Sequence, residues 1–143
     1  MKSAKIGAML FVFWGLLHVV GGGAILSAAL ASPDRGFAFY DPAAADYSRL
    51  AGDVLAYLAF GFVWIGLLVT AVGARYNWRN DRQALALNTA LVGCTDLGLV
   101  LFLVWPGHLS WLQASPGLLS FAGAVLFSGW ACRSAHAPAT APA

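Results

Sequence analysis

Four long apolar stretches dominate this chain and limit what it can fold into. They cover residues 6–31, 50–74, 84–105 and 115–132. Each is close to the roughly 20 apolar residues with which an α-helix spans a bilayer. The composition agrees, because 60% of the residues are hydrophobic and only 10% are charged, unlike a soluble globular domain. The sequence therefore predicts an integral membrane protein, with residues 1–143 forming a single membrane domain.

Short polar segments separate the later spans and determine how neighbouring helices run. RYNWRNDRQ at 75–83 and WPGHLSWLQASPG at 105–117 both have the composition of tight hairpins. Because short hairpins force consecutive spans to run antiparallel, we expect an all-α fold, an up-down-up-down four-helix bundle. Ser115 and Pro116 suit a helix cap followed by a first-turn proline, so they are expected to begin the last span. The tail at 134–143 has no periodicity and is expected to be disordered.

The distribution of basic residues predicts the orientation of the bundle. Short loops rich in Lys and Arg stay on the cytoplasmic side of a membrane. Six of the eight basic residues fall at one end of the spans, and these are Lys2, Lys5, Arg75, Arg79, Arg82 and Arg133. Only Arg35 and Arg49 fall at the other end, where turn signals at 32–36 and 41–42 join the first two spans. Both termini are therefore expected in the cytoplasm, and the net charge of +2 gives no support to nucleic-acid binding.

A carboxylic acid interrupts the third apolar stretch, in LVGCTDLGLVLFLVW at 91–105. An ionised Asp at the centre of a membrane helix costs roughly 2.5 to 3.5 kcal/mol, which favours a partner, a water-filled cavity or protonation. Asp96 lies twelve residues beyond Ala84, and His18 lies twelve beyond Ile6. The two helices run in the same direction, so both side chains should lie about 18 Å from the cytoplasmic boundary. We expect His18 and Asp96 to meet in one layer of the bundle.

Helical periodicity groups further polar and aromatic residues around this layer. At 100° per residue, the polar side chains of the third stretch fall within about a third of its circumference. The residues expected to line a pocket for a small ligand or a proton are Trp14, His18, Tyr57, Trp64, Asn88, Thr95 and Asp96. The alternative interpretation is that these side chains form a structural hydrogen-bonded network that fixes the register of the helices.

Other kinds of site find little support in the sequence. Bis-histidine haem is not expected, because His108 lies at the outer boundary and His136 in the tail, so neither is level with His18. No metal site is expected, since Cys94 lies on a different helix face from Asp96. The sequence has no Gly-rich phosphate loop and no CxxC motif. Catalytic residues, and whether the chain is an enzyme, stay open, and quinone or lipid remain as ligands to consider.

The segments GLLHVVGGG at 15–23 and DLGLVLFLVWPG at 96–107, with the short loops and small size, resemble the DoxX-like group of bacterial four-helix membrane proteins. The resemblance implies a multi-pass protein of the bacterial inner membrane. It also implies a redox role or an accessory role in a membrane complex. The chain differs from many members of that group because no arginine lies inside its first apolar stretch. No catalytic residue is carried over from the group.

Three functions remain open at this point. The first is the binding of a small hydrophobic ligand, or of a partner subunit or second copy of the chain, around the layer of His18 and Asp96. The second is a quinone-linked membrane oxidoreductase or its accessory subunit, with which an aromatic lining by Trp14, Tyr57 and Trp64 is compatible. The third is a proton-coupled carrier that works as an oligomer, because four helices alone make a small pathway.

Overall fold

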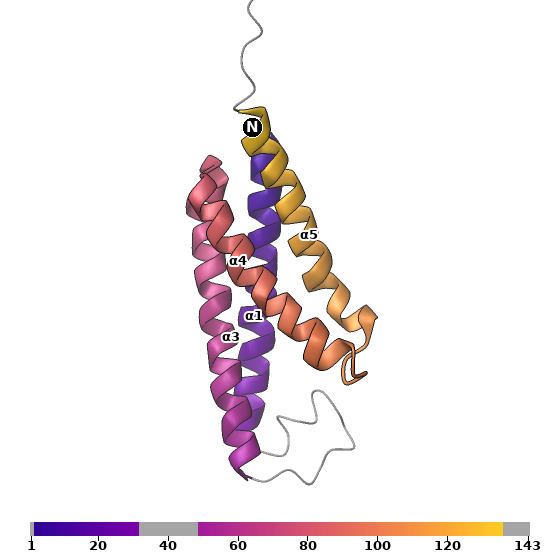
Figure 1. Ribbon diagram of the computed structural model, residues 1–143. Coiled ribbons are helices and arrows are strands. Elements are labelled where there is room, and N and C mark those ends of the chain that lie inside the picture. Colours follow the sequence, from indigo (N-terminus) through magenta and orange to yellow (C-terminus); the bar gives the residue numbers. More distant parts are fainter. Residues whose placement is uncertain (1, 32–48, 136–143) are drawn as a thin grey trace, which may run out of the picture.

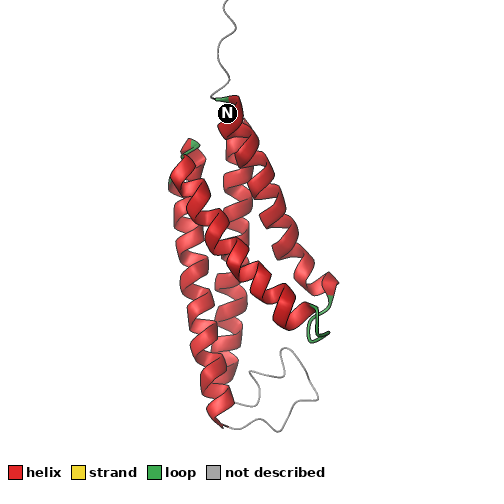
Figure 2. Ribbon diagram, viewed as in Figure 1, coloured by secondary structure: helices red, strands yellow, loops and turns green. Residues whose placement is uncertain are grey.

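A computed structural model describes residues 2–31 and 49–135 of the protein. All regular structure in these residues is helical, and no strand occurs among them (Figure 1, Figure 2). The long helices are α1 (Lys2–Ala31), α3 (Arg49–Arg75), α4 (Arg82–Leu99) and α5 (Trp111–Ser134). A short 3-10 helix η1 (Asn77–Arg79) follows α3, and a π-helical segment η2 (Val100–Val104) continues α4. The predicted all-α fold class is confirmed for these residues.

Two predicted features lie largely or wholly outside the described residues. The turns at 32–36 and 41–42 fall wholly in the segment that is not described. Of the predicted disordered tail, Ser134 still belongs to α5 and Ala135 is its C-terminal cap residue, and 136–143 are not described.

The four long helices are each long and apolar enough to cross a membrane. The candidate spans are Lys2–Ala31, Ala51–Arg79, Arg82–Val104 and Trp111–Ser134. Many large apolar side chains on them face outward, including Phe102, Leu112 and Leu126, which are 74%, 83% and 71% exposed. A soluble monomer rarely presents so much contiguous apolar surface to water, whereas lipid surrounds it at no such cost. The helices therefore indicate a multi-pass membrane protein.

The last helix begins earlier than the sequence predicts. Ser110 and Gln113 form a capping box, in which Ser110 Oγ accepts from Gln113 N at 3.3 Å and Gln113 Oε1 accepts from Ser110 N at 2.9 Å. Pro116 consequently lies inside the helix, where it cannot donate to the carbonyl oxygen of Leu112. Ser115 Oγ donates to that oxygen instead, at 2.9 Å. The prediction that Ser115 and Pro116 begin this helix is wrong, because the capping box satisfies the first donors a full turn upstream.

The helices are arranged around α1. It packs along both α3 and α5, whereas α4 makes fewer contacts and crosses from the end of α3 toward the start of α5 (Figure 1). The start of α1, the segment η1 and the end of α5 share one end of the molecule. There the ammonium of Lys5 lies 5.4 Å from the ring centroid of Trp78, and Asn80 Nδ2 donates to the carbonyl oxygen of Ala131 at 3.4 Å. Most of the described basic residues consequently gather at this end.

One buried cluster joins all four long helices and forms the centre of the core. It contains Phe11 and Trp14 from α1, Val69 from α3, Val92 from α4 and Ala124 from α5, all fully buried. Side chains at four-residue spacing share a helix face, and α4 accordingly buries Ala84, Asn88, Val92 and Asp96. Two of these four residues are polar, so the face of α4 that meets the core carries the acid.

Glycines allow α1 and α3 to approach each other closely. A Cβ atom built on Gly66 would lie 2.5 Å from the carbonyl oxygen of Gly15, and one built on Gly15 would lie 2.6 Å from that of Gly66. Small residues at such contacts let helix backbones pack closely in membranes. This contact fixes the rotation of α1 about its axis and thereby the direction in which Trp14 and His18 point.

Candidate functional site

The indole of Trp14 is the hydrogen-bond partner of the intramembrane acid. Trp14 Nε1 donates to Asp96 Oδ1 at 3.1 Å, which joins α1 to α4. Trp14 is fully buried and Asp96 is 5% exposed, so the bond lies inside the protein and away from lipid. A buried indole N–H needs an acceptor, and the carboxyl oxygen supplies one. The acid predicted to need a partner therefore has one.

His18 joins the same layer through Trp14. The two rings are stacked, with centroids 3.6 Å apart and planes 21° from parallel. His18 Nδ1 lies 3.0 Å from the carbonyl oxygen of Trp14, which can only accept, so Nδ1 carries the proton and Nε2 is left as the acceptor of the neutral ring. The Phe62 ring of α3 packs against the imidazole in a T-shaped arrangement at a centroid distance of 6.1 Å. The expected direct meeting of His18 and Asp96 is thus replaced by a chain in which the indole stands between them.

Several polar atoms in this interior have no hydrogen-bond partner among the described residues. Asp96 Oδ2 and Asn88 Oδ1, both on α4, are two of them, and Thr70 Oγ1 of α3 is a third. Asn88 satisfies only its amide N–H, since Nδ2 donates to the carbonyl oxygen of Val69 at 3.3 Å. A buried polar group without a partner costs about 1 to 3 kcal/mol. These three oxygen atoms therefore lack the donors that buried polar groups usually have.

The structure does not bring Tyr57 and Trp64 into this layer. Their side chains are 75% and 58% exposed on the outer surface of α3. The predicted alignment of the two residues on one helix face does not decide which face turns inward. Gly66 and the other small residues make the close contact with α1, so the bulky aromatic face is left pointing outward. As a correction to the expected pocket, its aromatic lining is reduced to Trp14 with His18.

Thr95 precedes Asp96 but its hydroxyl bonds within α4. Thr95 Oγ1 donates to the carbonyl oxygen of Leu91 at 2.8 Å, as Thr side chains commonly do inside helices. The side chain is half-buried. Of the seven expected site residues, the structure therefore gathers Trp14, His18 and Asp96 in one cluster, with Asn88 two turns away on the same buried face of α4.

Two features of the interior are not expected from the sequence, namely the donor role of Trp14 and the burial of the Thr70 hydroxyl. The signal for Trp14 is its position one turn before His18 on a predicted buried face, where an indole N–H has to find an acceptor. Thr70 carries no comparable signal, because only the contact between α1 and α3 buries it.

Neither a cluster of metal ligands nor a known relative indicates what chemistry this layer carries out. Within residues 2–31 and 49–135, no group of three or more His, Cys, Asp or Glu side chains comes together in a way that could hold a metal ion. Comparisons of the chain with protein-family models, curated proteins and solved structures find no match. The functional argument therefore depends on the geometry of the helices and of the layer that they enclose.

Proposed function

We propose that the chain is a small multi-pass protein of the bacterial inner membrane, related to the DoxX-like group, that binds a small hydrophobic ligand in the layer of Trp14, His18 and Asp96. Its spans run up-down-up-down, with both termini in the cytoplasm. The positive-inside rule supports this orientation, because the basic residues gather at the end shared by the start of α1, η1 and the end of α5.

The observation that carries the proposal is the half-satisfied carboxyl group of Asp96. Oδ1 accepts the indole N–H, while the buried Oδ2 has no partner among the described residues. An acid inside a membrane protein is expensive, and an apolar residue would pack in its place without that cost. A ligand with one polar group satisfies Oδ2, and its apolar part lies against the stacked rings of Trp14 and His18. The quinone-linked alternative depended on an aromatic lining by Trp14, Tyr57 and Trp64. Because Tyr57 and Trp64 are exposed and do not line the layer, we favour ligand binding.

The experiment that tests ligand binding is mass spectrometry of small molecules that stay bound to the full chain after extraction in a mild detergent. Asp96→Asn keeps an oxygen for the Trp14 indole and converts the Oδ2 position into an amide donor. Thr95→Val is the matched control on the neighbouring residue, since its hydroxyl bonds only within α4. We expect the wild type and Thr95→Val to retain the same molecule in similar amounts. The amount bound to Asp96→Asn should be lower by about tenfold or more.

Circular dichroism and thermal unfolding of each variant distinguish binding from a purely structural role. Loss of the molecule at an unchanged unfolding temperature supports the proposal. Unchanged retention in Asp96→Asn and in His18→Phe, or equal loss in Asp96→Asn and Thr95→Val, contradicts it. An Asp96→Leu variant that is more stable than the wild type and still retains the molecule would show that the layer does not bind the ligand.

The orientation has a separate test. A green fluorescent protein fused after residue 143 fluoresces only in the cytoplasm, and an alkaline phosphatase fused at the same place is active only outside it. We expect fluorescence without phosphatase activity, and the reverse pattern would overturn the proposed orientation.

A further inference from the structure

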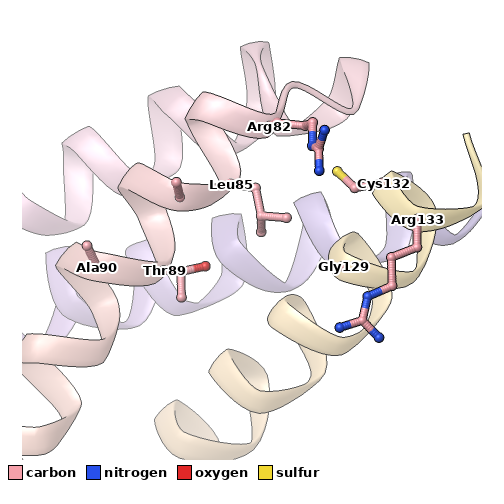
Figure 3. A pocket seen from close by; sticks show the side chains of 8 residues that line it. Arg82, Leu85, Thr89, Ala90, Gly129, Cys132 and Arg133 are labelled. Atoms are coloured by element: carbon pink, nitrogen blue, oxygen red, sulfur yellow. The ribbon is translucent and has the colours of Figure 1, made fainter. Parts of the chain in front are cut away.

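An open groove of about 470 Å³ lies between α4 and α5, away from the layer of Asp96. It lies at the end of the molecule that carries η1, because the lining residue Cys132 donates from Sγ to Asn80 Oδ1 at 3.3 Å. In Figure 3, Leu85 projects from α4 toward α5, the Arg82 side chain lies beside Cys132, and the Arg133 side chain extends from α5 in a direction away from Arg82. Both arginines line the groove. Its volume falls within the range of about 300 to 1,000 Å³ that is usual for small-molecule sites.

The groove changes from charged to apolar along its length. Arg82 opens α4 and Arg133 lies in the last turn of α5, and both side chains are exposed. Thr89 lines the groove seven residues after Arg82, so the groove runs about 10 Å along α4 from the basic end. On α4, Leu85 and Ala86 line the stretch between them. A binding partner that is anionic at one end and apolar along the next 10 Å or so fits this gradient.

Gly129 leaves part of the groove open on the side of α5. A Cβ atom built on Gly129 would meet no other atom within 4 Å, so the space beside this lining residue is not filled by the protein. Among the glycines of the long helices, Gly7, Gly15 and Gly66 serve close backbone contacts, and Gly129 does not. The absence of a side chain at this position therefore widens the groove.

No acidic side chain lines the groove. Three of the described residues are acidic, and Asp53 lies near the start of α3 at the opposite end, while Asp96 lies in the interior. Asp81 is the acid nearest to Arg82 in the sequence, and its Oδ1 accepts from Ala84 N at 3.0 Å as the cap of α4. The basic end of the groove consequently attracts an anion.

We propose that this groove binds one anionic phospholipid, with the headgroup phosphate at the basic end that Arg82 and Arg133 line and the upper part of an acyl chain along Leu85 and Gly129. Guanidinium groups bind phosphate with two parallel hydrogen bonds, and basic pockets between transmembrane helices on the cytoplasmic side recognise anionic headgroups. The proposal depends on the membrane orientation given above and is independent of ligand binding at Asp96.

Native mass spectrometry of the full chain in a neutral detergent tests the headgroup. The probes are phosphatidylglycerol and phosphatidylcholine with identical acyl chains, which differ in net charge. We expect phosphatidylglycerol to bind more tightly, and Arg82→Gln with Arg133→Gln to weaken its binding by about 30-fold. The matched control is Arg75→Gln with Arg79→Gln, which removes the same charge at the same end outside the groove and should leave binding unchanged.

A second pair of variants tests the apolar part of the groove. Gly129→Leu fills the open space, and Gly61→Leu is its control on α3, because a Cβ atom at Gly61 also meets no atom within 4 Å. We expect only Gly129→Leu to weaken phosphatidylglycerol binding, by about tenfold or more, with the helix content of both variants unchanged in circular dichroism.

Several outcomes would overturn the proposal. They are equal binding of the two lipids, equal loss in the two double arginine variants, and unchanged binding in Gly129→Leu. Binding of inorganic phosphate without retained lipid would overturn the lipid as the source of the phosphate. A dimer of the chain that Gly129→Leu dissociates would assign the groove to a second copy instead.

Discussion

Replacing Gly15 by alanine is expected to destabilise the protein by about 2 kcal/mol, although alanine is the better helix former. The added Cβ atom would lie 2.6 Å from the carbonyl oxygen of Gly66, 0.8 Å short of the 3.4 Å at which ordinary contact begins. A helix carbonyl cannot rotate away, so α1 and α3 have to separate. Overpacking of this kind costs about 1 to 3 kcal/mol, and a backbone obstacle places the cost near the upper value. The higher helix propensity of alanine offsets about 1 kcal/mol of this destabilisation.

The assay is reversible unfolding in mixed detergent micelles, followed by circular dichroism. Gly21→Ala is the matched control on the same helix, because a Cβ atom there meets no atom within 4 Å, and it should leave the free energy of unfolding equal or raise it. Adding Thr70→Ala to Gly15→Ala should recover only part of the loss. The Thr70 hydroxyl is the atom nearest to the added Cβ but belongs to a side chain that can rotate, and the Gly66 carbonyl remains. Equal effects of Gly15→Ala and Gly21→Ala would refute the close approach of α1 and α3.

Three further predictions use the same unfolding assay. Asn88→Leu should be neutral or stabilising by about 1 kcal/mol, because it removes a buried oxygen without a partner; a clear loss of stability would contradict this. Ser115→Ala should cost about 1 kcal/mol by depriving the Leu112 carbonyl of its donor, and that cost should vanish in a Pro116→Ala background, where the amide of residue 116 donates instead. Asn80→Ala should cost about 1 to 2 kcal/mol because φ is 63° at this residue, whereas Asn80→Gly should lose less; equal losses would show that the side-chain bonds of Asn80 dominate.

Hydropathy predicts where the helices lie but not where they begin and end. The apolar stretches are long enough to identify the spans, because the requirement to cross a bilayer sets their length. The start of α5 differs from the prediction because Pro116 lies inside the helix and does not mark its first turn. Ser110 and Gln113 carry the start signal, and they lie in a polar segment that hydropathy assigns to a loop.

The sequence predicts how deep the site residues lie in the membrane, but it does not predict how each helix is rotated about its axis. Counting twelve residues from each boundary puts His18 and Asp96 on one level, but the direction of each side chain depends on how the helices turn about their axes. The contact between Gly15 and Gly66 sets that rotation for α1 and α3. A contact between two helices cannot be deduced from either sequence segment alone. The choice of Asp96 as the acceptor for the Trp14 indole and the outward direction of Tyr57 therefore could not be predicted.

The bond between Trp14 and Asp96 also bears on the order in which the chain assembles. Translation delivers α1 to the membrane before α4, because synthesis proceeds from the N-terminus. The indole is therefore already in place when the acid emerges from the insertion machinery. A chain shortened by α1 would offer Asp96 to hydrocarbon with neither oxygen bonded, so the carboxyl group makes retention of α4 conditional on the presence of α1.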